Sequence, residues 1–192
     1  SCVVLVATIR ALKMHGGVEK DNLKNENLDA LKKGMSNLER HIQNIKKFGL
    51  EVVVAINHFI TDTDREVKII QGQCNKLGTK VSLCTHWSDG GEGAKDLANN
   101  VVDLCKKSDS SKFKHLYSDQ ISILEKVEKI AKEIYSAKAI EVDEKIKEQI
   151  KKIEQAGFGR FPVCIAKTQY SFSTDPKLKG APSDHTLSIR EV

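Results

Sequence analysis

Two aromatic side chains in this sequence are placed where a flat ligand could bind between them. Phe59 and Trp87, the only tryptophan, each come just after a segment that reads as a buried strand. In open parallel α/β sheets, ligands bind in the crevice outside the carboxyl ends of the strands. Two rings that project from neighbouring strand ends can stack on both faces of a planar guest. The pair therefore predicts a cleft for a planar ligand; the alternative is that both rings only cap the hydrophobic core.

Residues around the two aromatics predict the rest of that cleft. Leu83, near the end of the third predicted strand, would form its floor, and the flanking segments are polar and rich in glycine. Glycine lets a backbone approach a ligand closely, so these flanks favour an open cleft over a closed core. Further cleft-lining candidates follow the ends of the predicted strands: Asn57, Ile60, Asp62, His15, Gly16, Gly17, Gly90 and Gly91.

Several of these candidates have a plainer structural interpretation. His15 could be an ordinary surface histidine of a loop, and Asp62 could help to cap the helix that follows it. The run Gly90–Lys95 lacks the Gly-Lys-Ser/Thr ending of a phosphate-binding P-loop. Its backbone amides could attract an anion at the start of the next helix, but a simple helix-entry turn explains the same residues.

Composition and motifs argue against several other classes of protein. The chain has 31 basic and 26 acidic residues and no basic block interleaved with aromatics, which argues against nucleic-acid binding. No apolar run approaches the roughly 20 residues of a membrane span. The five cysteines are odd in number and lack a Cys-x-x-Cys motif, which favours a reduced intracellular protein over a disulfide scaffold. Cys84, His58 and His86 do not complete a structural zinc site, and no Ser-His-Asp elbow is present, so no metal site is predicted.

The hydrophobic pattern predicts an α/β fold, a parallel sheet with flanking helices in the layering of P-loop NTPase and Rossmann folds. Strands and helices alternate along residues 1–107, which is typical of right-handed crossovers. Thr63 and Glu66 form the capping box of one helix. The expected elements are a strand at Val3–Ile9, a loop at Arg10–Gly17, a helix from Leu28 to about Phe48, a strand at Glu51–Ile56, a helix from Thr63 to Gly78, a strand at Lys80–Cys84 and a helix from about Ala94 to Cys105.

The remainder of the chain changes character. Residues 108–160 are expected to form an added helical hairpin, with apolar stripes over Ile123–Ile134 and Val142–Ile153. Residues 161–192 begin with a predicted strand at Val163–Ala166, and both ends of the chain are strand-like. Natural domains usually begin and end with exposed, loosely held segments, so we expect an incomplete domain cut from a longer protein.

Five segments carry a more specific signal: Val6–Gly17, Val54–Phe59 with Thr61–Thr63, Trp87–Gly93, Gly157–Gly159 with Pro162, and Ala166–Ser173. In order and spacing they resemble the formate–tetrahydrofolate ligase (10-formyltetrahydrofolate synthetase) family. The resemblance covers the whole of this chain but only an interior portion of such a ligase.

The resemblance implies an enzyme that uses ATP to activate formate as formyl phosphate and then formylates N10 of tetrahydrofolate. The products would be 10-formyltetrahydrofolate, ADP and phosphate. It implies that Phe59 and Trp87 clamp the folate and that Leu83 lines the same pocket, in a folate-facing core of residues 1–107. Ile60 replaces a proline that many members carry, which alters the stiffness of the loop rather than the stacking.

The resemblance also implies what this chain lacks. The P-loop of the family, and the basic residues that hold formyl phosphate, lie in a preceding region. ATP with Mg²⁺ would therefore bind mainly outside the chain, the catalytic residues are unknown, and the piece would be inactive alone. The intact enzyme is expected to be a cytoplasmic or organellar homo-oligomer. Its partners would be tetrahydrofolate, formate and ATP, with no nucleic acid and no membrane. The competing interpretation is a non-catalytic α/β module for interaction or scaffolding.

Overall fold

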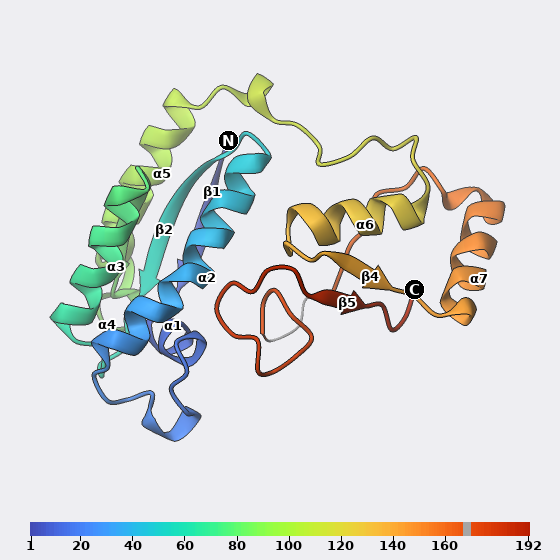
Figure 1. The fold of residues 1–192 in the computed structure, drawn as a ribbon. Helices are drawn as coiled ribbons and strands as arrows, with labels where there is room; N and C mark the ends of the chain where they lie inside the picture. The colour runs from blue at the N-terminus through green and yellow to red at the C-terminus, as the bar shows by residue number, and fades with distance from the viewer. Residues whose placement is uncertain (167–169) are drawn as a thin grey trace. The chain divides into compact units, whose positions relative to one another are not determined.

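The structure is a computed structural model that describes residues 1–166 and 170–192. These residues divide into two compact units, residues 1–114 and residues 115–192, which are described separately (Figure 1). Lys167, Thr168 and Gln169, which belong to the last of the five resembling segments, lie outside the described residues.

The first unit is built around a parallel sheet with the strand order β1-β2-β3. Strands and helices alternate along it, as the hydrophobic pattern predicts, so that each crossover connects neighbouring parallel strands. Its elements are β1 (Cys2–Ala7), α1 (Ile9–His15), η1 (Lys20–Asn22), α2 (Leu28–Lys47), β2 (Glu51–Asn57), α3 (Asp64–Lys76), β3 (Lys80–Cys84), α4 (His86–Asp89), η2 (Gly90–Ala94), α5 (Lys95–Lys107) and η3 (Ser110–Lys112).

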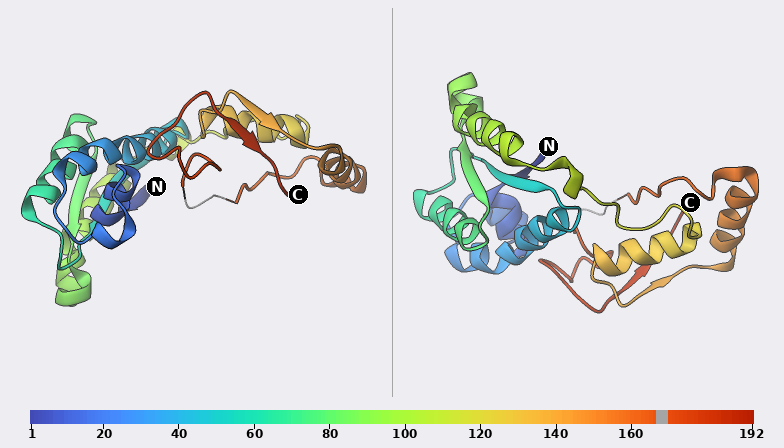
Figure 2. Two further views of the ribbon diagram at one scale, coloured as in Figure 1. Left: turned by 60° about the horizontal axis from the view of Figure 1, so that its bottom comes forward. Right: turned by 90° about the horizontal axis from the view of Figure 1, so that it is seen from above.

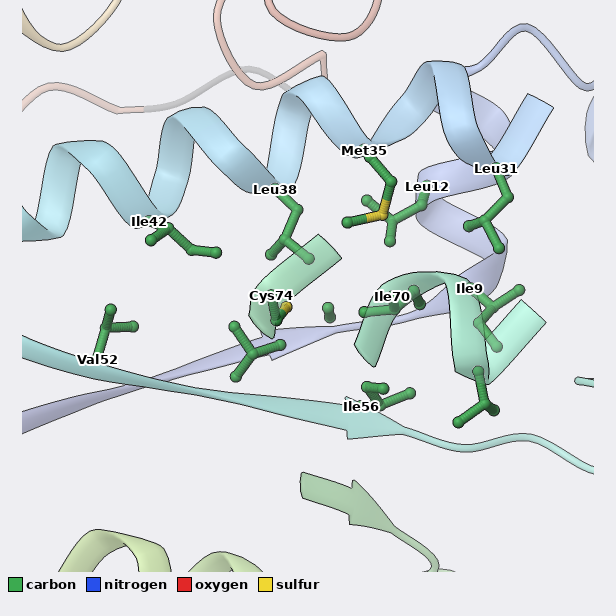
Figure 3. Packing of buried hydrophobic residues seen from close by; sticks show 13 residues of the cluster. Ile9, Leu12, Leu31, Met35, Leu38, Ile42, Val52, Ile56, Ile70 and Cys74 are labelled. Atoms are coloured by element: carbon green, nitrogen blue, oxygen red, sulfur yellow. The ribbon is translucent and has the colours of Figure 1, made fainter. Parts of the chain in front are cut away.

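Helices lie on both faces of this sheet, which confirms the predicted α/β class. Side chains alternate between the two faces along a strand, so Val52 and Val54 of β2 point into the core beneath α2 and α3. Ala55 points to the opposite face, where its neighbour Ser82 accepts a hydrogen bond from Asn100 of α5. The views in Figures 2 and 3 show the strands lying between α2 and α5.

The core of the first unit is a single cluster of aliphatic side chains between the sheet and the helices α1, α2 and α3 (Figure 3). Burying each such side chain contributes about 1.5–3 kcal/mol relative to leaving it exposed. This cluster therefore fixes the sheet on which the loops beyond β2 and β3 are carried. Its buried members are Ala7, Ile9, Leu12, Leu31, Met35, Leu38, Ile42, Val52, Val54, Ile56, Val67, Ile70 and Cys74.

The helix starts agree with the sequence signals where a cap is present. Thr63 Oγ1 accepts the backbone N–H of Glu66, and a Glu66 carboxylate oxygen accepts the backbone N–H of Thr63, at 3.3 and 3.2 Å. This is the predicted capping box, and α3 begins at the next residue. The long predicted helix is present as α2, with Asn27 as its N-cap.

The prediction of a loop at Arg10–Gly17 is wrong. Residues Ile9–His15 form the helix α1, so Ile9 begins a helix instead of ending a strand. The backbone of Thr8 is extended, and its hydroxyl accepts the N–H of Ala11, which is an N-cap. A helix of seven residues has only two turns, so its apolar periodicity is short. Its buried residues Ile9 and Leu12 follow the apolar residues of the strand directly, so the sequence pattern does not separate the two elements.

The second unit contains α6 (Ile123–Glu133), β4 (Ala139–Glu141), α7 (Glu144–Ile153), the π-helical turn η4 (Glu154–Phe158) and β5 (Thr186–Ser188). The two helices of the predicted hairpin are present, and the short strand β4 lies between them along the chain. β4 pairs in parallel with β5, with Ile140 opposite Leu187. The buried apolar residues between α6 and α7 are Ile123, Val127, Ile146 and Ile150.

The predicted strand at Val163–Ala166 is wrong, because these residues form no strand in the structure. The backbone N–H of Val163 donates to the hydroxyl of Tyr117 at 2.9 Å instead of joining a ladder. Val163 and Ile165 do pack against the apolar cluster of α6 and α7, which explains why the run is apolar. Apolar character alone does not supply a partner strand.

Candidate functional site

The ends of β2 and β3 lie side by side and place the two predicted site aromatics on neighbouring connections. Asn57, the last residue of β2, pairs with Cys84, the last residue of β3. The backbone N–H of His58 donates to the carbonyl of Cys84 at 3.1 Å, so the pairing continues past the end of β2. Phe59 follows this point by one residue on one side, and Trp87 follows by three on the other. Both therefore leave the same carboxyl edge of the sheet, where ligands of open α/β sheets bind.

The backbone at Phe59 is closed into a short turn by Asp62. The N–H of Asp62 donates to the carbonyl of Phe59 at 2.8 Å, and the N–H of Phe59 donates to the Asp62 carboxylate at 2.9 Å. The carboxylate therefore holds the Phe59 turn, whereas Thr63 caps α3. The plainer interpretation, in which Asp62 caps the following helix, is replaced by this role in the turn.

Arg10 of α1 holds the same turn from the neighbouring strand connection. Its guanidinium carbon lies over the Phe59 ring, 4.4 Å from the centroid, and one terminal nitrogen donates to the Thr61 hydroxyl at 3.1 Å. A cation within about 6 Å of a ring centroid is attracted to the face of the ring. The sequence interpretation missed Arg10; the available signal was a charged residue three positions past the end of β1, the strand beside β2.

A buried ion pair joins α1 to the first turn of α3, the helix that follows the Phe59 turn. The ammonium of Lys13 is 2.9 Å from Glu66 Oε1, and neither side chain is exposed. Lys13 also donates to the carbonyl of Asn25, and the backbone N–H of Asn27 donates to Glu66. A charge buried without a partner is costly, so this set of contacts fixes α1, the start of α2 and the start of α3 together. The sequence interpretation missed Lys13 and assigned Glu66 only to the capping box, because a sequence does not reveal which charged side chains become buried.

Trp87 is presented on the short helix α4, with 56% of its surface exposed. The loop is fastened through Thr85, whose N–H donates to the carbonyl of Gly93 and whose carbonyl accepts the N–H of Ser88, each at 3.0 Å. The Thr85 hydroxyl donates to the Asp89 carboxylate at 2.5 Å. Hydrogen bonds from Thr85, and then from Ser88, lower the pKa of Asp89, because they stabilise its charged form. The Trp87 ring is therefore exposed to solvent, while hydrogen bonds within the loop fix the backbone that carries it.

Gly93 allows this close contact between its own backbone and that of Thr85. A Cβ built at this position would lie 2.5 Å from the carbonyl carbon of Thr85 and 2.7 Å from the N atom of His86. Any other residue would push the two backbone segments apart. The glycine-rich run therefore has a structural function next to Trp87, in agreement with the helix-entry interpretation.

The other predicted site residues are placed as follows. Leu83 is half-buried and packs against the core of the first unit. Ile60 is 81% exposed at the tip of the Phe59 turn, and Asn57 is half-buried at the end of β2. Gly90 and Gly91 are exposed in the loop after α4. Whether these residues line a cleft stays a prediction.

His15, Gly16 and Gly17 end the helix α1 instead of forming a loop. His15 is buried, which differs from the surface interpretation. A Cβ on Gly16 would overlap the carbonyl oxygen of Ala30 at 1.8 Å, so this glycine is explained by the close packing of α1 on α2. Gly17 is exposed, and its N–H donates to the carbonyl of Met14.

Within residues 1–166 and 170–192, no group of three or more His, Cys, Asp or Glu side chains is arranged to hold a metal ion. Over the same described residues, every helix is too short or too polar to span a lipid bilayer.

Comparisons with known proteins agree with the resemblance in the sequence. The family model described as formate–tetrahydrofolate ligase matches residues 1–192. The chain is 62% identical over 192 residues to a formate–tetrahydrofolate ligase of Pelagibacter ubique, covering 100% of this chain and 34% of that protein. It is 55% identical over 190 residues to the ligase of Hyphomonas neptunium, covering 99% of this chain and 34% of that protein. The chain thus spans about a third of the length of these curated relatives, and it belongs to the formate–tetrahydrofolate ligase family.

Proposed function

We propose that this chain supplies the folate-binding face of a ligase that uses ATP and formate to formylate N10 of tetrahydrofolate. The products are 10-formyltetrahydrofolate, ADP and phosphate. The observation that carries the proposal is the placement of Phe59 and Trp87 on adjacent connections at the carboxyl edge of the sheet, with Trp87 56% exposed. Family membership supports the choice of reaction, and this placement supports the proposed role of the chain in it.

In this proposal Phe59 and Trp87 stack on the ring system of the folate, and Leu83 forms the floor. Each aromatic contact contributes about 0.5–1.5 kcal/mol beyond the area that it buries. Asn57, Ile60 and Asp62 lie on the Phe59 side, and the backbone of Gly90 and Gly91 lies on the Trp87 side. Holding N10 in place against an acyl phosphate is the catalytic contribution of such a site, because positioning alone removes several kcal/mol from a bimolecular barrier.

The rest of the reaction is assigned to the part of the ligase outside this chain. The 192 residues contain no Gly-x-x-x-x-Gly-Lys-Ser/Thr loop, so we propose that ATP and Mg²⁺ bind elsewhere in the protein. Residues 1–107 are then the folate-facing core, residues 108–160 an adjoining helical segment, and residues 161–192 a continuation. The piece alone does not turn over, and the complete enzyme is a cytoplasmic homo-oligomer.

Trp87 allows a direct test, because it is the only tryptophan and gives one ¹⁹F resonance when the chain is labelled with fluorotryptophan. Tetrahydrofolate, added under nitrogen, is expected to shift this resonance in a saturable way. Phe59→Leu should weaken the response, and Trp87→Phe should retain more binding by calorimetry than Trp87→Ala.

Phe161→Leu is the matched control, since it removes an aromatic side chain that is 59% exposed and belongs to the second unit. It should leave the titration unchanged. A folded, labelled chain whose resonance does not move at millimolar tetrahydrofolate would contradict the proposal and favour the interaction-module interpretation.

A further inference from the structure

We propose that Arg10 is a positioning residue of the folate site, which covers one face of Phe59 and leaves only the opposite face for the ligand. This inference rests on the proposed function, because it specifies how one of the two stacking rings is used. It assigns a role to a residue of α1 that lies in neither aromatic loop.

Arg10 occupies one face of the Phe59 ring. A phenyl ring has two faces, and the guanidinium carbon of Arg10 lies over one of them at 4.4 Å from the centroid. Carbon atoms pack at about 3.5–4.0 Å, so no second planar group fits between the guanidinium and the ring. A ligand that stacks on Phe59 must therefore use the face turned away from Arg10.

Two contacts hold the guanidinium of Arg10 against the Phe59–Asp62 turn. Arg10 contacts the Phe59–Asp62 turn twice, through the ring and through the hydrogen bond to the Thr61 hydroxyl. Its planar group stacks on aromatic faces better than a lysine ammonium does. Since Asp62 fixes the backbone of Phe59 and Arg10 fixes the ring, the side chain and main chain are held by separate contacts.

Arg10 and Asp62 also carry buried polar atoms that have no hydrogen-bond partner. Within the described part of the first unit, only Nε of Arg10 and Oδ1 of Asp62 are buried side-chain polar atoms without a hydrogen-bond partner. Most buried polar groups in proteins have a hydrogen-bond partner, and water or a ligand can satisfy the remainder. Both atoms belong to side chains that contact Phe59, Arg10 at its ring and Asp62 at its backbone, so two side chains that hold Phe59 keep unused hydrogen-bonding capacity.

The charge of Arg10 changes the electrostatics of the opposite face of the Phe59 ring. A positive charge on one face draws π-electron density toward itself, so the opposite face becomes less negative. That face favours an electron-rich ring and disfavours a cation. Between reduced and fully oxidised pteridines, the reduced ring is the richer in electrons, so Arg10 favours tetrahydrofolate over folate.

The test uses a complete ligase carrying these residues. Arg10→Met is expected to raise KM for tetrahydrofolate about tenfold, with KM for ATP and for formate unchanged. It should also reduce the preference for tetrahydrofolate over folate in equilibrium binding. Arg10→Lys, which restores the charge without the planar group, should recover part of both effects.

Arg65→Met is the matched control, because Arg65 is on α3, is 70% exposed in its side chain and pairs with Glu26 on the surface. It should change none of the three KM values. A double-mutant cycle with Phe59→Leu tests the route of the effect: if Arg10 acts through the ring, Arg10→Met should add little once the ring is gone.

The outcomes separate this inference from the proposed function. If Phe59→Leu leaves KM for tetrahydrofolate unchanged, the folate site itself is misplaced. If Phe59→Leu raises that KM and Arg10→Met does not, only the role of Arg10 is overturned. Equal increases in all three KM values, with a lowered thermal midpoint, would show that Arg10 is merely structural and would also overturn the inference.

Discussion

Lys13 and Glu66 form a completely buried ion pair, with the ammonium 2.9 Å from one carboxylate oxygen. The two residues come from α1 and α3, and the carboxylate also accepts the backbone N–H groups of Asn27 and Thr63. One carboxylate therefore joins the first turn of α3 to the helix that carries Arg10. The position of the Phe59 turn depends on this joint, since the turn lies between β2 and α3.

Removing one member of the pair should strongly destabilise the chain. We expect Glu66→Gln to lower the free energy of unfolding by about 3–5 kcal/mol, because the Lys13 ammonium stays buried without a counter-charge. Adding Lys13→Met to this variant should recover part of the loss, since no buried charge is left. Urea denaturation measures both changes.

The exposed pair of Arg65 and Glu26 provides the comparison. Arg65→Met should cost at most about 1 kcal/mol, as is typical of a surface ion pair. A loss of similar size in Glu66→Gln would show that the buried pair does not hold the helices together.

The sequence predicted those features that depend on local pattern. The strand at Lys80–Cys84, the helix from Leu28 and the capping box of Thr63 and Glu66 agree with the structure, because each has a complete periodicity or cap of its own. The helix α1 was missed because seven residues give too short a pattern. The strand expected at Val163–Ala166 is absent because a strand requires a partner, and an apolar run does not specify one.

The site was predictable only in outline. Phe59 and Trp87 could be placed because both follow strand ends, and strand ends of a parallel sheet share an edge. Arg10 could not be assigned to Phe59, since 49 positions separate them and only the pairing of β1 with β2 brings them together. Gly16 was interpreted as a cleft residue, although the backbone of Ala30 explains it.

The close approach of Gly93 to Thr85 should be essential for presenting Trp87. Gly93→Ala places a Cβ 2.5 Å from the Thr85 carbonyl carbon, so the loop must open and the Thr85–Gly93 hydrogen bond is lost. We expect a red-shifted Trp87 emission and at least a threefold weaker affinity for tetrahydrofolate. Gly72→Ala, in α3, is the control, because a Cβ there also meets no atom within 4 Å and Gly72 is not part of the proposed folate site. Equal behaviour of the two variants would contradict the role of the close approach.

The thiol of Cys74 should make the stability of the chain depend on alkaline pH. Burial, and secondarily the charge of Glu39, raises its pKa from the ordinary thiol value of 9.0 to about 11. Because the folded state holds the proton more tightly, this stabilisation is complete below pH 9 and is lost as pH rises toward 11.

Urea denaturation at several pH values between 8 and 11 can isolate this effect, since lysines and tyrosines also titrate there. Cys74→Ala lowers stability at every pH through the cavity that it leaves, but its curve should fall less steeply with pH than that of the unaltered chain. Cys164→Ala, at an exposed cysteine, should keep the original slope. Identical slopes for all three chains would show that Cys74 does not ionise on unfolding.

The sulfur atoms of Cys2 and Cys105 lie 3.7 Å apart, between β1 and α5, so mild oxidation should join them. Two thiols lose two protons and two electrons to an added oxidant such as diamide, and an S–S bond of about 2.05 Å forms. Burial, and then the neighbouring Cys105, raises the pKa of Cys2, so its thiolate is scarce at neutral pH and the reaction should accelerate as pH rises. The loop that closes is long, so the bond should stabilise the first unit by about 2–4 kcal/mol. Peptide mapping should find this pair in preference to one with the exposed Cys164, and Cys105→Ser should abolish both the bond and the stabilisation. A random mixture of pairings would show that the two sulfurs are not held together in solution.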